Sequence, residues 1–493
     1  MKNFYLLLLI GLFATTVYAK KKMSLFSPDK TIKVEFCLSD KIYYDIYYND
    51  EILLKDNYLR LFLNNEILGD NPKLLRQKRK SFSEELKPVV PLKFSTVMSR
   101  YNTLILDFKG YSIEFCAFDD GVAYRFITHK TDKVEVLGED FAISFPKEYL
   151  LHLQQPSSFK TPYEEEYTHI SSQEWKDTDK MSVLPILIDT RKQYKILVGE
   201  SDRFDYPCMF LKGNGKNGLN AIFPKVPLEF AEEGDLSMKI TKEADYIAQT
   251  EGNRNYPWRY FVITSEDSQL IENTMNYKLA TKSVLEDNSW IKPGLASWEW
   301  WHDARLYGVD FRSGYNMDSY KYYIDFASTF GIPYIIMDEG WAKSTRDPFT
   351  PNPTIDLQEL IKYGKERNVK IVLWLTWLSP DLTVGRCNHF DLFKTFADWG
   401  IAGVKIDFMD RSDQWMVNYY ERVAKEAARH KLFVDFHGSF KPARLERRYP
   451  NVLSYEGVLG MEQGGNCKPA TSIYLPFMRN AVGPMDFTPG SMF

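Results

Sequence analysis

Cysteine is scarce and irregularly spaced in this sequence. Its 493 residues include an odd number of cysteines, five in all: Cys37, Cys116, Cys208, Cys387 and Cys467. Disulfide frameworks use even numbers of cysteines at short, regular spacings, so no such framework is expected. The seven histidines are equally scattered, and there is neither a His/Cys zinc spacing nor a Gly-x-Ser-x-Gly elbow. These absences argue against a structural zinc module and against a serine hydrolase of that type.

Basic residues are not in surplus. Lysine and arginine together number 62, against 66 aspartates and glutamates, which gives a formal net charge of −4. A protein that neutralises nucleic-acid phosphates needs a basic surplus, so nucleic-acid binding is not expected. Hydrophobic residues, at 44%, and aromatic residues, at 15%, are abundant enough for large cores. At this length we expect two domains.

The N-terminus has the pattern of a secretory signal. Lys2 supplies a positive charge, residues 5–13 are apolar, and small residues precede a cleavage site at Ala19. The apolar run is too short for a good membrane span, and no cysteine follows it that could carry a lipid anchor. We therefore predict a cleaved signal peptide over residues 1–19 and a periplasmic location for the rest of the chain.

Strand patterns dominate residues 20–278. Residues 31–36 alternate apolar and polar side chains, and residues 101–128 contain three strand-like runs separated by Lys-Gly and Asp-Asp-Gly turns. Helical periodicity is almost lacking in this part of the sequence. We predict an N-terminal β-sandwich domain.

From residue 279 onward, short apolar runs alternate with amphipathic helices such as residues 319–330 and 355–368. Seven runs are typical of buried strands: 294–301, 333–337, 369–375, 403–408, 432–436, 452–454 and 484–487. This alternation predicts parallel strands with right-handed crossovers, and hence a catalytic (β/α)8 barrel over residues 279–493. Because such a barrel has eight strands, we expect this one to be truncated at its C-terminal end, and the chain to be a fragment of a longer protein.

Acids and tryptophans gather at the predicted strand ends, where barrel enzymes carry their chemistry. The set comprises Trp298, Glu299, Trp301, Asp338, Glu339, Trp374, Trp377, Asp407, Asp410, His437, Glu456 and Glu462. Any single one could equally be a loop residue or a helix N-cap. As a set they indicate glycoside hydrolysis, in which one carboxyl group protonates the leaving oxygen and a second attacks carbon or activates water. The same oxygens suit a calcium-type cation.

Several motifs in these segments resemble one family. They are "FDDGVAYRF", "TPYEEEYTH", "IIMDEGW", "GVKIDFMD" and "FHGSFKP…RRYPNVLSYEGVLGMEQ…GPMDFTPG". Together they resemble glycoside hydrolase family 97, calcium-dependent and exo-acting α-glycosidases. The resemblance covers nearly the whole chain after the signal. It implies a β-supersandwich, a (β/α)8 barrel and a C-terminal β domain, the last of which we expect to be missing here.

The resemblance also implies a mechanism. Inverting α-glucosidases of this family carry a glutamate base directly after the histidine of the "FH" strand. Retaining members, typified by α-galactosidases, carry a small residue there and use an aspartate that ends the fourth strand. Here Gly438 follows His437, and Asp407 ends the fourth strand. The chain therefore resembles the retaining branch, with Asp407 as the implied nucleophile and Glu462 as the implied acid/base for terminal α-linked galactose. An inverting α-glucosidase and a catalytically disabled carbohydrate-binding fragment are the alternatives.

Further site residues are expected around this pair. The implied Ca2+ ligands are Glu456, Glu462 and a glutamate of the sandwich domain, for which we favour Glu164 over Glu165 and Glu166. Lys405 lies two residues before Asp407 and so on the same side of the strand, where it is expected to bind sugar hydroxyls and balance the charge of Asp407. The alternative is that it only neutralises Asp407. Further candidates for binding an oligosaccharide or α-galactoside substrate are Asp338, Trp301, Trp374 and His437.

Overall fold

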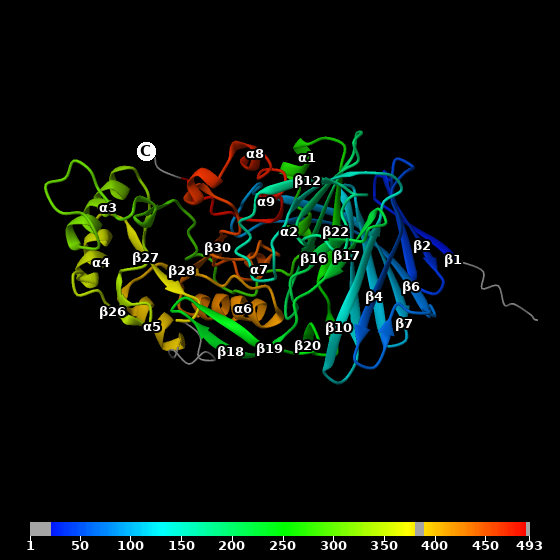
Figure 1. The fold of residues 1–493 in the computed structure, drawn as a ribbon, viewed down its shortest axis with the longest axis horizontal. Coiled ribbons are helices and arrows are strands. Elements are labelled where there is room, and N and C mark those ends of the chain that lie inside the picture. Colours follow the sequence, from blue (N-terminus) through cyan, green and yellow to red (C-terminus); the bar gives the residue numbers. More distant parts are fainter. Residues whose placement is uncertain (1–20, 380–388, 490–493) are drawn as a thin grey trace, which may run out of the picture.

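The computed structural model describes residues 21–379 and 389–489, so the predicted signal peptide lies outside the described residues. Figure 1 shows a β-rich N-terminal body, coloured blue to green, beside a C-terminal body of strands and helices, coloured yellow to red. The last described segment, in red, lies over the junction between the two bodies. The four cysteines among the described residues are free thiols.

Two large antiparallel sheets form the N-terminal body. The first contains, in spatial order, β1 (Lys21–Phe26), β2 (Ile32–Leu38), β3 (Ile42–Tyr48), β4 (Glu51–Leu63), β10 (Val134–Ser144), β17 (Gly218–Ile222), β16 (Phe210–Gly213) and β13 (Ser182–Val183), with β5 (Ile67–Leu68) on β4 and β20 (Ala248–Thr250) on β10. The second contains β12 (Tyr167–Ser171), β11 (Leu150–Gln154), β14 (Ile186–Asp189), β15 (Lys195–Ser201), β22 (Trp258–Thr264), β9 (Gly121–His129), β8 (Tyr111–Phe118), β7 (Val97–Phe108) and β6 (Arg76–Leu86), with β21 (Asn253–Asn255) on β9.

The sandwich core lies between these two sheets. Strand β2 alternates buried and half-buried residues, as a strand with one face on a core must. Its Phe36 packs edge-on against Phe115 of β8, with ring centroids 4.5 Å apart. The predicted β-sandwich is therefore confirmed, including the three strands expected over residues 101–128.

The outer face of the second sheet is also covered. All seven residues of β22 are buried. Its Tyr260 and Val262 belong to a cluster that includes Met275 of α2 (Met275–Leu279) and Met478 of the last described segment. Helix α1 (Ser268–Glu272) contributes Leu270 to the same cluster. The C-terminal segment is thus packed directly onto the sandwich.

Six parallel strands make the sheet of the C-terminal body among the described residues. In order they are β23 (Ala296–Trp298), β24 (Tyr334–Met337), β27 (Lys370–Thr376), β28 (Gly403–Asp407), β29 (Phe433–Phe436) and β30 (Val452–Tyr455). The helices are α3 (Met317–Thr329), α4 (Leu357–Lys365), α5 (His389–Trp399), α6 (Gln414–Arg429), α7 (Leu445–Arg448), α8 (Pro469–Ser472) and α9 (Arg479–Val482), with 3-10 turns η1 (Trp300–His302) and η3 (Met461–Asn466). The sheet is an incomplete (β/α)8 barrel, as predicted.

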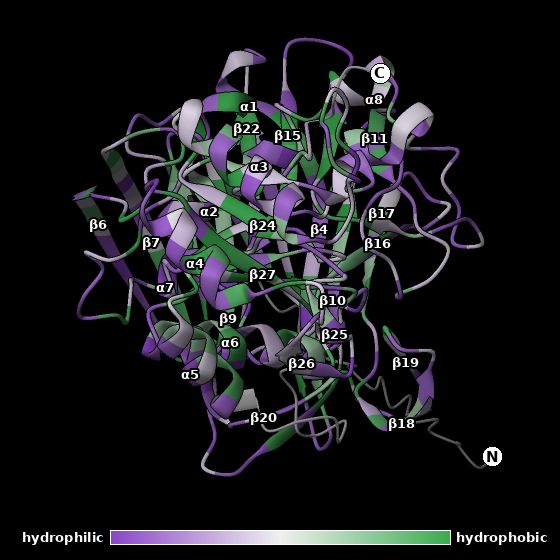
Figure 2. Cartoon of the chain, turned by 90° about the vertical axis from the view of Figure 1, so that its left-hand side faces the viewer, coloured by the Kyte–Doolittle hydropathy of each residue, from purple (hydrophilic) through white to green (hydrophobic). Residues whose placement is uncertain are grey.

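Strand burial explains this arrangement. Six of the seven residues of β27 are buried, which is typical of a parallel strand covered on both faces. Figure 2 shows β24 and β27 in hydrophobic green, with the more hydrophilic α3 and α4 lying over them. The two helices predicted for residues 319–330 and 355–368 correspond to α3 and α4.

The seventh predicted strand, residues 484–487, is wrong. The segment is extended beside β30, but it makes a single backbone hydrogen bond there, from Asp486 N to Tyr455 O at 2.9 Å. Pro484 has no N–H to donate, so the segment cannot form a regular ladder. An apolar run alone does not distinguish such a packed segment from a strand.

Two small hairpins complete the fold. One, β18 (Pro227–Glu233) with β19 (Ser237–Glu243), reaches from the sandwich to α6 (Figure 1). The other, β25 (Ala342–Ser344) with β26 (Asp347–Pro351), follows β24. The side chain of Arg346 joins the two hairpins through an ion pair with Asp235, at 2.6 Å. No helix within the described residues is both long and apolar enough to cross a membrane.

Candidate active site

The fourth barrel strand, β28, carries two of the predicted site residues. Parallel pairing places Lys405 level with Trp374 of β27 on one side and with Asp435 of β29 on the other. Asp407 ends the strand, level with Thr376. Since the carboxyl ends of parallel strands share one edge, the register alone brings these side chains onto one rim.

Asp407 is held by two hydrogen bonds. Trp374 donates from Nε1 to Asp407 Oδ2 at 3.1 Å, and the backbone N–H of Phe408 donates to Oδ1 at 2.8 Å. The Asp407 side chain is 14% exposed, so one edge of it reaches solvent. Phe408 and Asp410 both have left-handed backbone conformations, with φ of 65° and 47°. This tight turn stops the strand and leaves the carboxylate at its tip.

Lys405 has a nearer partner than the predicted one. Its ammonium lies 2.7 Å from Asp338 Oδ2 and 3.7 Å from Asp407 Oδ2. Burial lowers the pKa of Lys405, but the charges of Asp338 and Asp407 outweigh that effect and hold its pKa above the usual value. Lys405 is therefore a charged group between two carboxylates. It binds Asp338 first, and spacing along one strand could not show this.

Asp338 is fixed by Trp298 and Glu299, which the sequence placed at a strand end but gave no role. Trp298 donates from Nε1 to Asp338 Oδ2 at 2.6 Å, and Glu299 Oε1 accepts from the backbone N–H of Asp338 at 2.8 Å. Burial and the charge of Asp338 raise the pKa of Glu299 to about 8. The sequence located both residues at the end of the first strand. It could not predict their hydrogen bonds to Asp338, because these bonds join different strands. Trp301 lies half-buried on η1.

A second group of donors surrounds His437. Nδ1 of His437 lies 3.3 Å from Glu456 Oε2, and Nε2 lies 2.9 Å from Asp486 Oδ2 and 3.4 Å from Asp435 Oδ2. In the described part of the chain, histidine and carboxylate atoms that could ligate a metal ion and lie within 4.8 Å of one another form two sets. One contains Asp435, His437 and Asp486, and the other contains His437, Glu456 and Glu462. Of these, Asp435 and Asp486 were not among the residues predicted from the sequence, although Asp486 lies in the motif "GPMDFTPG".

Glu164 faces this group from the sandwich domain. Its Oε2 accepts a hydrogen bond from Gln463 Nε2 at 2.7 Å, one residue beyond Glu462. Burial, together with the charges of Glu456, Asp410 and Glu462, raises the pKa of Glu164 well above the ordinary value. Burial and the charge of Asp407 likewise raise the pKa of Glu456, although His437 opposes the shift. Glu164 does not belong to either of the two sets within 4.8 Å.

The two competing glutamates have other partners. Glu165 accepts from Thr161 Oγ1 at 2.8 Å, and Glu166 forms an exposed ion pair with Lys468 at 2.6 Å. Glu164, by contrast, is close enough to Glu456 and Glu462 for burial and their charges to raise its pKa. The structure therefore directs Glu164, rather than its neighbours, at the site.

The donor set fits a hard divalent cation. Several buried or half-buried carboxylates crowd together, and burial together with the neighbouring negative charges raises the pKa values of Glu164 and Glu456. Carboxylate oxygens are the ligands that Ca2+ takes in proteins. Glu164, Glu456 and Glu462 would hold such an ion between the two bodies of the protein.

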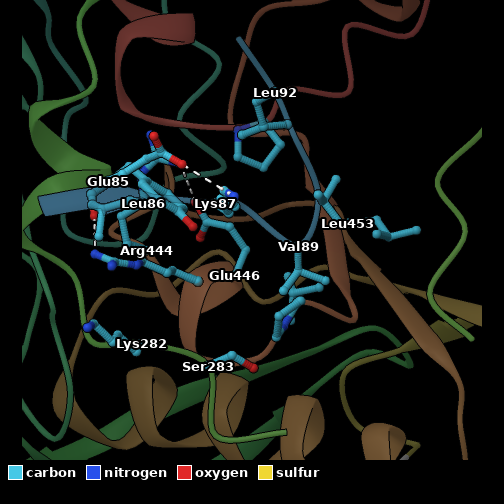
Figure 3. Close-up of a pocket in the computed structure, with 16 residues that line it drawn as sticks. Glu85, Leu86, Lys87, Val89, Leu92, Lys282, Ser283, Arg444, Glu446 and Leu453 are labelled. Atoms are coloured by element: carbon cyan, nitrogen blue, oxygen red, sulfur yellow. Dashed lines mark hydrogen bonds and ion pairs between the residues drawn. The ribbon is translucent and has the colours of Figure 1, made fainter. Parts of the chain in front are cut away.

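Space for a ligand lies beside Trp374, which donates a hydrogen bond to Asp407. A cavity of about 260 Å3 lies between the β25–β26 hairpin and the ends of β24 and β27, and Trp374, Glu339 and Asn352 help to line it. Figure 3 shows a separate pocket of about 320 Å3, in which side chains of β6 and the loop after it face α7 and β30. It contains two ion pairs, Lys87 with Glu85 and Arg444 with Glu446. None of the predicted site residues lines this second pocket, whereas Trp374 lines the first.

Comparison with known proteins agrees with this geometry. Residues 299–458 match the glycoside hydrolase 97 family, and residues 25–281 match the glycosyl-hydrolase 97 N-terminal family. The whole chain is 36% identical to a protein of Bacteroides thetaiotaomicron that is named a retaining α-galactosidase, and it covers 76% of that protein. The chain belongs to glycoside hydrolase family 97.

Three other proteins extend the comparison. Over 76% of its length, the chain is 30% identical to a probable retaining α-galactosidase of Streptomyces bingchenggensis, of which it covers 54%. A family 97 enzyme of Pseudoalteromonas, solved in complex with acarbose, shares the fold with a TM-score of 0.82 at 22% identity, over 95% of this chain and 74% of that one. A β-arabinopyranosidase gives a TM-score of 0.79 at 21% identity, over 94% and 75%.

Proposed function

We propose that this family 97 glycoside hydrolase is a retaining, exo-acting α-galactosidase. In this proposal Asp407 is the nucleophile, Glu462 is the acid/base, and Glu164, Glu456 and Glu462 hold Ca2+. The names of the two similar proteins support retention and galactose specificity. We further propose that the protein works in the periplasm on the terminal α-galactosyl group of an oligosaccharide.

The observation that carries the proposal is the lack of room at Gly438. Gly438 has a left-handed backbone with φ of 52°, and a Cβ atom there would lie 2.8 Å from both Asp410 Oδ1 and the backbone N of Phe408. Inverting relatives are expected to carry their glutamate base at this position. A glutamate side chain would collide with the turn that presents Asp407, so the local backbone favours an aspartate nucleophile over an inverting base.

The reaction then follows from the two carboxyl groups. Burial raises the pKa of Glu462, although Lys405 and His437 oppose the shift. A raised pKa keeps a fraction of Glu462 protonated, as a general acid requires. Glu462 gives its proton to the leaving oxygen while Asp407 attacks the anomeric carbon, which forms a glycosyl ester and releases the alcohol. Water then gives a proton to Glu462 and attacks the anomeric carbon, whose bond to the Asp407 oxygen breaks, so the sugar leaves with its original anomeric configuration.

Asp338 and Lys405 are proposed to bind the sugar hydroxyls. Both are buried beside Asp407, and each can exchange part of its mutual hydrogen bond for a hydroxyl group. Trp374 would cover one side of the ring while fixing Asp407, and Trp301 and His437 lie on the same rim. A bound calcium ion would add positive charge beside Glu462 and so tune its proton affinity.

Proton NMR of the hydrolysis tests this function. The purified protein with calcium is given p-nitrophenyl α-D-galactoside, and separately the α-glucoside, while the first anomer of the free sugar is recorded. α-Galactose appearing before mutarotation is the expected result. β-Sugar appearing first would mean inversion and would overturn the role of Asp407. No product from either substrate would favour a carbohydrate-binding protein without catalysis.

A further inference from the structure

The motif "GPMDFTPG" contributes a carboxylate that has no role in the reaction above. Asp486 is anchored at two points: its backbone N–H donates to Tyr455 O at 2.9 Å, and its Oδ1 accepts from the backbone N–H of Thr488 at 3.2 Å. The other oxygen, Oδ2, is left to face Nε2 of His437 at 2.9 Å. The motif therefore holds one carboxylate oxygen against one imidazole nitrogen.

His437 is fixed on its other side as well. Its backbone N–H donates to Ile406 O at 2.8 Å, directly before Asp407. The side chain is 3% exposed, and Nδ1 lies 3.3 Å from Glu456 Oε2. The imidazole ring thus spans the gap between the Asp486 and Glu456 carboxylates. Asp435 Oδ2 also approaches Nε2, but at the longer distance of 3.4 Å.

The orientation of Glu456 depends on this ring. Glu456 Oε2 accepts a hydrogen bond from the backbone N–H of Gly438 at 2.9 Å and faces the ring with the same atom. That leaves Oε1 for other partners, and Glu456 shares the set within 4.8 Å with Glu462. A carboxylate fixed by one oxygen presents the other in a defined direction.

We propose that Asp486 is a positioning residue, which orients His437 and, through it, the Glu456 carboxylate for cation binding and for its placement beside Glu462. The inference rests on the proposed function, in which Glu456 and Glu462 hold calcium. It adds a residue from the end of the described chain to the site. Such outer partners typically change metal affinity or activity by about 10–100-fold when they are lost.

The test compares Asp486→Asn with the parent chain. Calcium affinity is measured by titration calorimetry, and kcat and KM are measured with p-nitrophenyl α-D-galactoside at saturating calcium. We expect the dissociation constant for calcium to rise by about 10–100-fold and kcat to fall by a similar factor. KM should stay within about twofold, because the contacts of Asp338 and Lys405 are unchanged. Asp486→Glu keeps the charge, so its calcium affinity and kcat should lie between those of the parent and those of Asp486→Asn.

Glu426→Gln is the matched control. Glu426 also contacts a histidine, His430, at 3.2 Å, but on α6. It should change neither the calcium affinity nor kcat. If Asp486→Asn has the calcium affinity and kcat of the parent, or differs from it no more than Glu426→Gln does, the positioning role of Asp486 is wrong. The proposed function would be unaffected by that result. A parent that binds no calcium removes the proposed metal site and the inference with it. If Asp486→Asn fails to fold, a parent-like affinity and kcat in Asp486→Glu, whose longer side chain displaces the carboxylate, would overturn the inference.

Discussion

At the scale of single residues, Asp407 offers the most direct test. Asp407→Ala removes the proposed nucleophile while leaving Glu462 to protonate the leaving group. We expect kcat to fall by roughly 10⁴-fold or more. Added azide should restore part of the turnover with an activated substrate by attacking from the vacated face, and the product should be β-galactosyl azide.

Glu462→Ala supplies the contrast for that experiment. Asp407 still forms the glycosyl ester in this variant, so azide should react with the ester and give α-galactosyl azide. Opposite azide configurations from the two variants would assign both roles at once. If azide rescues neither variant, or gives the same anomer with both, Asp407 is not the nucleophile.

Glu299 gives a prediction for pH. Its pKa is raised from 4.5 to about 8 in the folded protein, so the folded state favours the protonated carboxyl. The stability that this group contributes is complete below about pH 4.5 and is lost as the pH rises through 8. Glu299→Gln has no charge to bury. Relative to the parent, its free energy of unfolding should therefore increase by roughly 2–4 kcal/mol between pH 5 and pH 9.

Urea unfolding of both proteins at the two pH values measures this difference. The exposed Glu366 provides the control, since Glu366→Gln should leave the difference between pH 5 and pH 9 unchanged. The prediction is wrong if the free energy of unfolding changes equally between pH 5 and pH 9 in the parent and in Glu299→Gln. That result would mean that the folded protein ionises Glu299 at little cost.

The sequence predicted which residues lie in the site better than it predicted the hydrogen bonds and ion pairs between them. Asp407, Lys405 and Asp338 were found because strand ends carry the chemistry of barrels. That Lys405 lies nearer to Asp338 than to Asp407 depends on the packing of two strands, because Lys405 and Asp338 are 67 residues apart in the sequence. Spacing along one strand carries no such information. Asp486 was missed for the same reason, because its contact with His437 crosses 49 residues.

At the scale of elements, the sequence predicted six of the barrel strands and both helices named above. It failed for residues 484–487, a mostly apolar segment that is buried or half-buried and lies beside β30 without a ladder. Burial produces the apolar pattern whether or not a backbone ladder forms, so the pattern could not separate the two cases.

Helix α6 begins at a residue with two functions. Asp413 is its N-cap and accepts from the backbone N–H of Met416 at 3.0 Å, and it also pairs with the buried Arg411 at 2.8 Å. Asp413→Ala should therefore cost about 3–5 kcal/mol of unfolding free energy, because Arg411 would stay buried without its anion. Chemical denaturation measures this cost.

Asp356→Ala separates the cap from the ion pair. Asp356 caps α4 in the same way, accepting from the backbone N–H of Glu359 at 3.0 Å, but it is exposed. Its loss should cost only about 1 kcal/mol. Equal costs for the two variants would mean that Arg411 finds another partner or reaches water.

At the scale of the whole molecule, the junction between the two bodies was the least predictable feature. Two bodies follow from the change in sequence pattern, but their contacts do not. Thr161 N donates to Asp410 O at 2.8 Å, and Cys208 N donates to Ser412 O at 2.8 Å, so the sandwich is bonded to the turn directly after Asp407. Main-chain contacts of this kind leave no side-chain pattern in the sequence. They bring Glu164 to the site.

If Glu164 holds calcium as proposed, the stability of both bodies should depend on calcium. In a chelator, Glu164→Gln should be more stable than the parent, because it removes one of several crowded carboxylates. In the presence of calcium the parent should be more stable than Glu164→Gln. Calcium at 100 times its dissociation constant stabilises the parent by about 2.7 kcal/mol, whereas the variant has lost a ligand. Melting temperatures of both proteins with and without calcium, measured alongside activity, test this reversal.

Glu166→Gln is the control, because it breaks only the exposed ion pair with Lys468. Its melting temperature should rise with calcium as that of the parent does. If Glu166→Gln loses the calcium shift and Glu164→Gln keeps it, the sandwich ligand is Glu166, and the crowding around Glu164 is not a metal site.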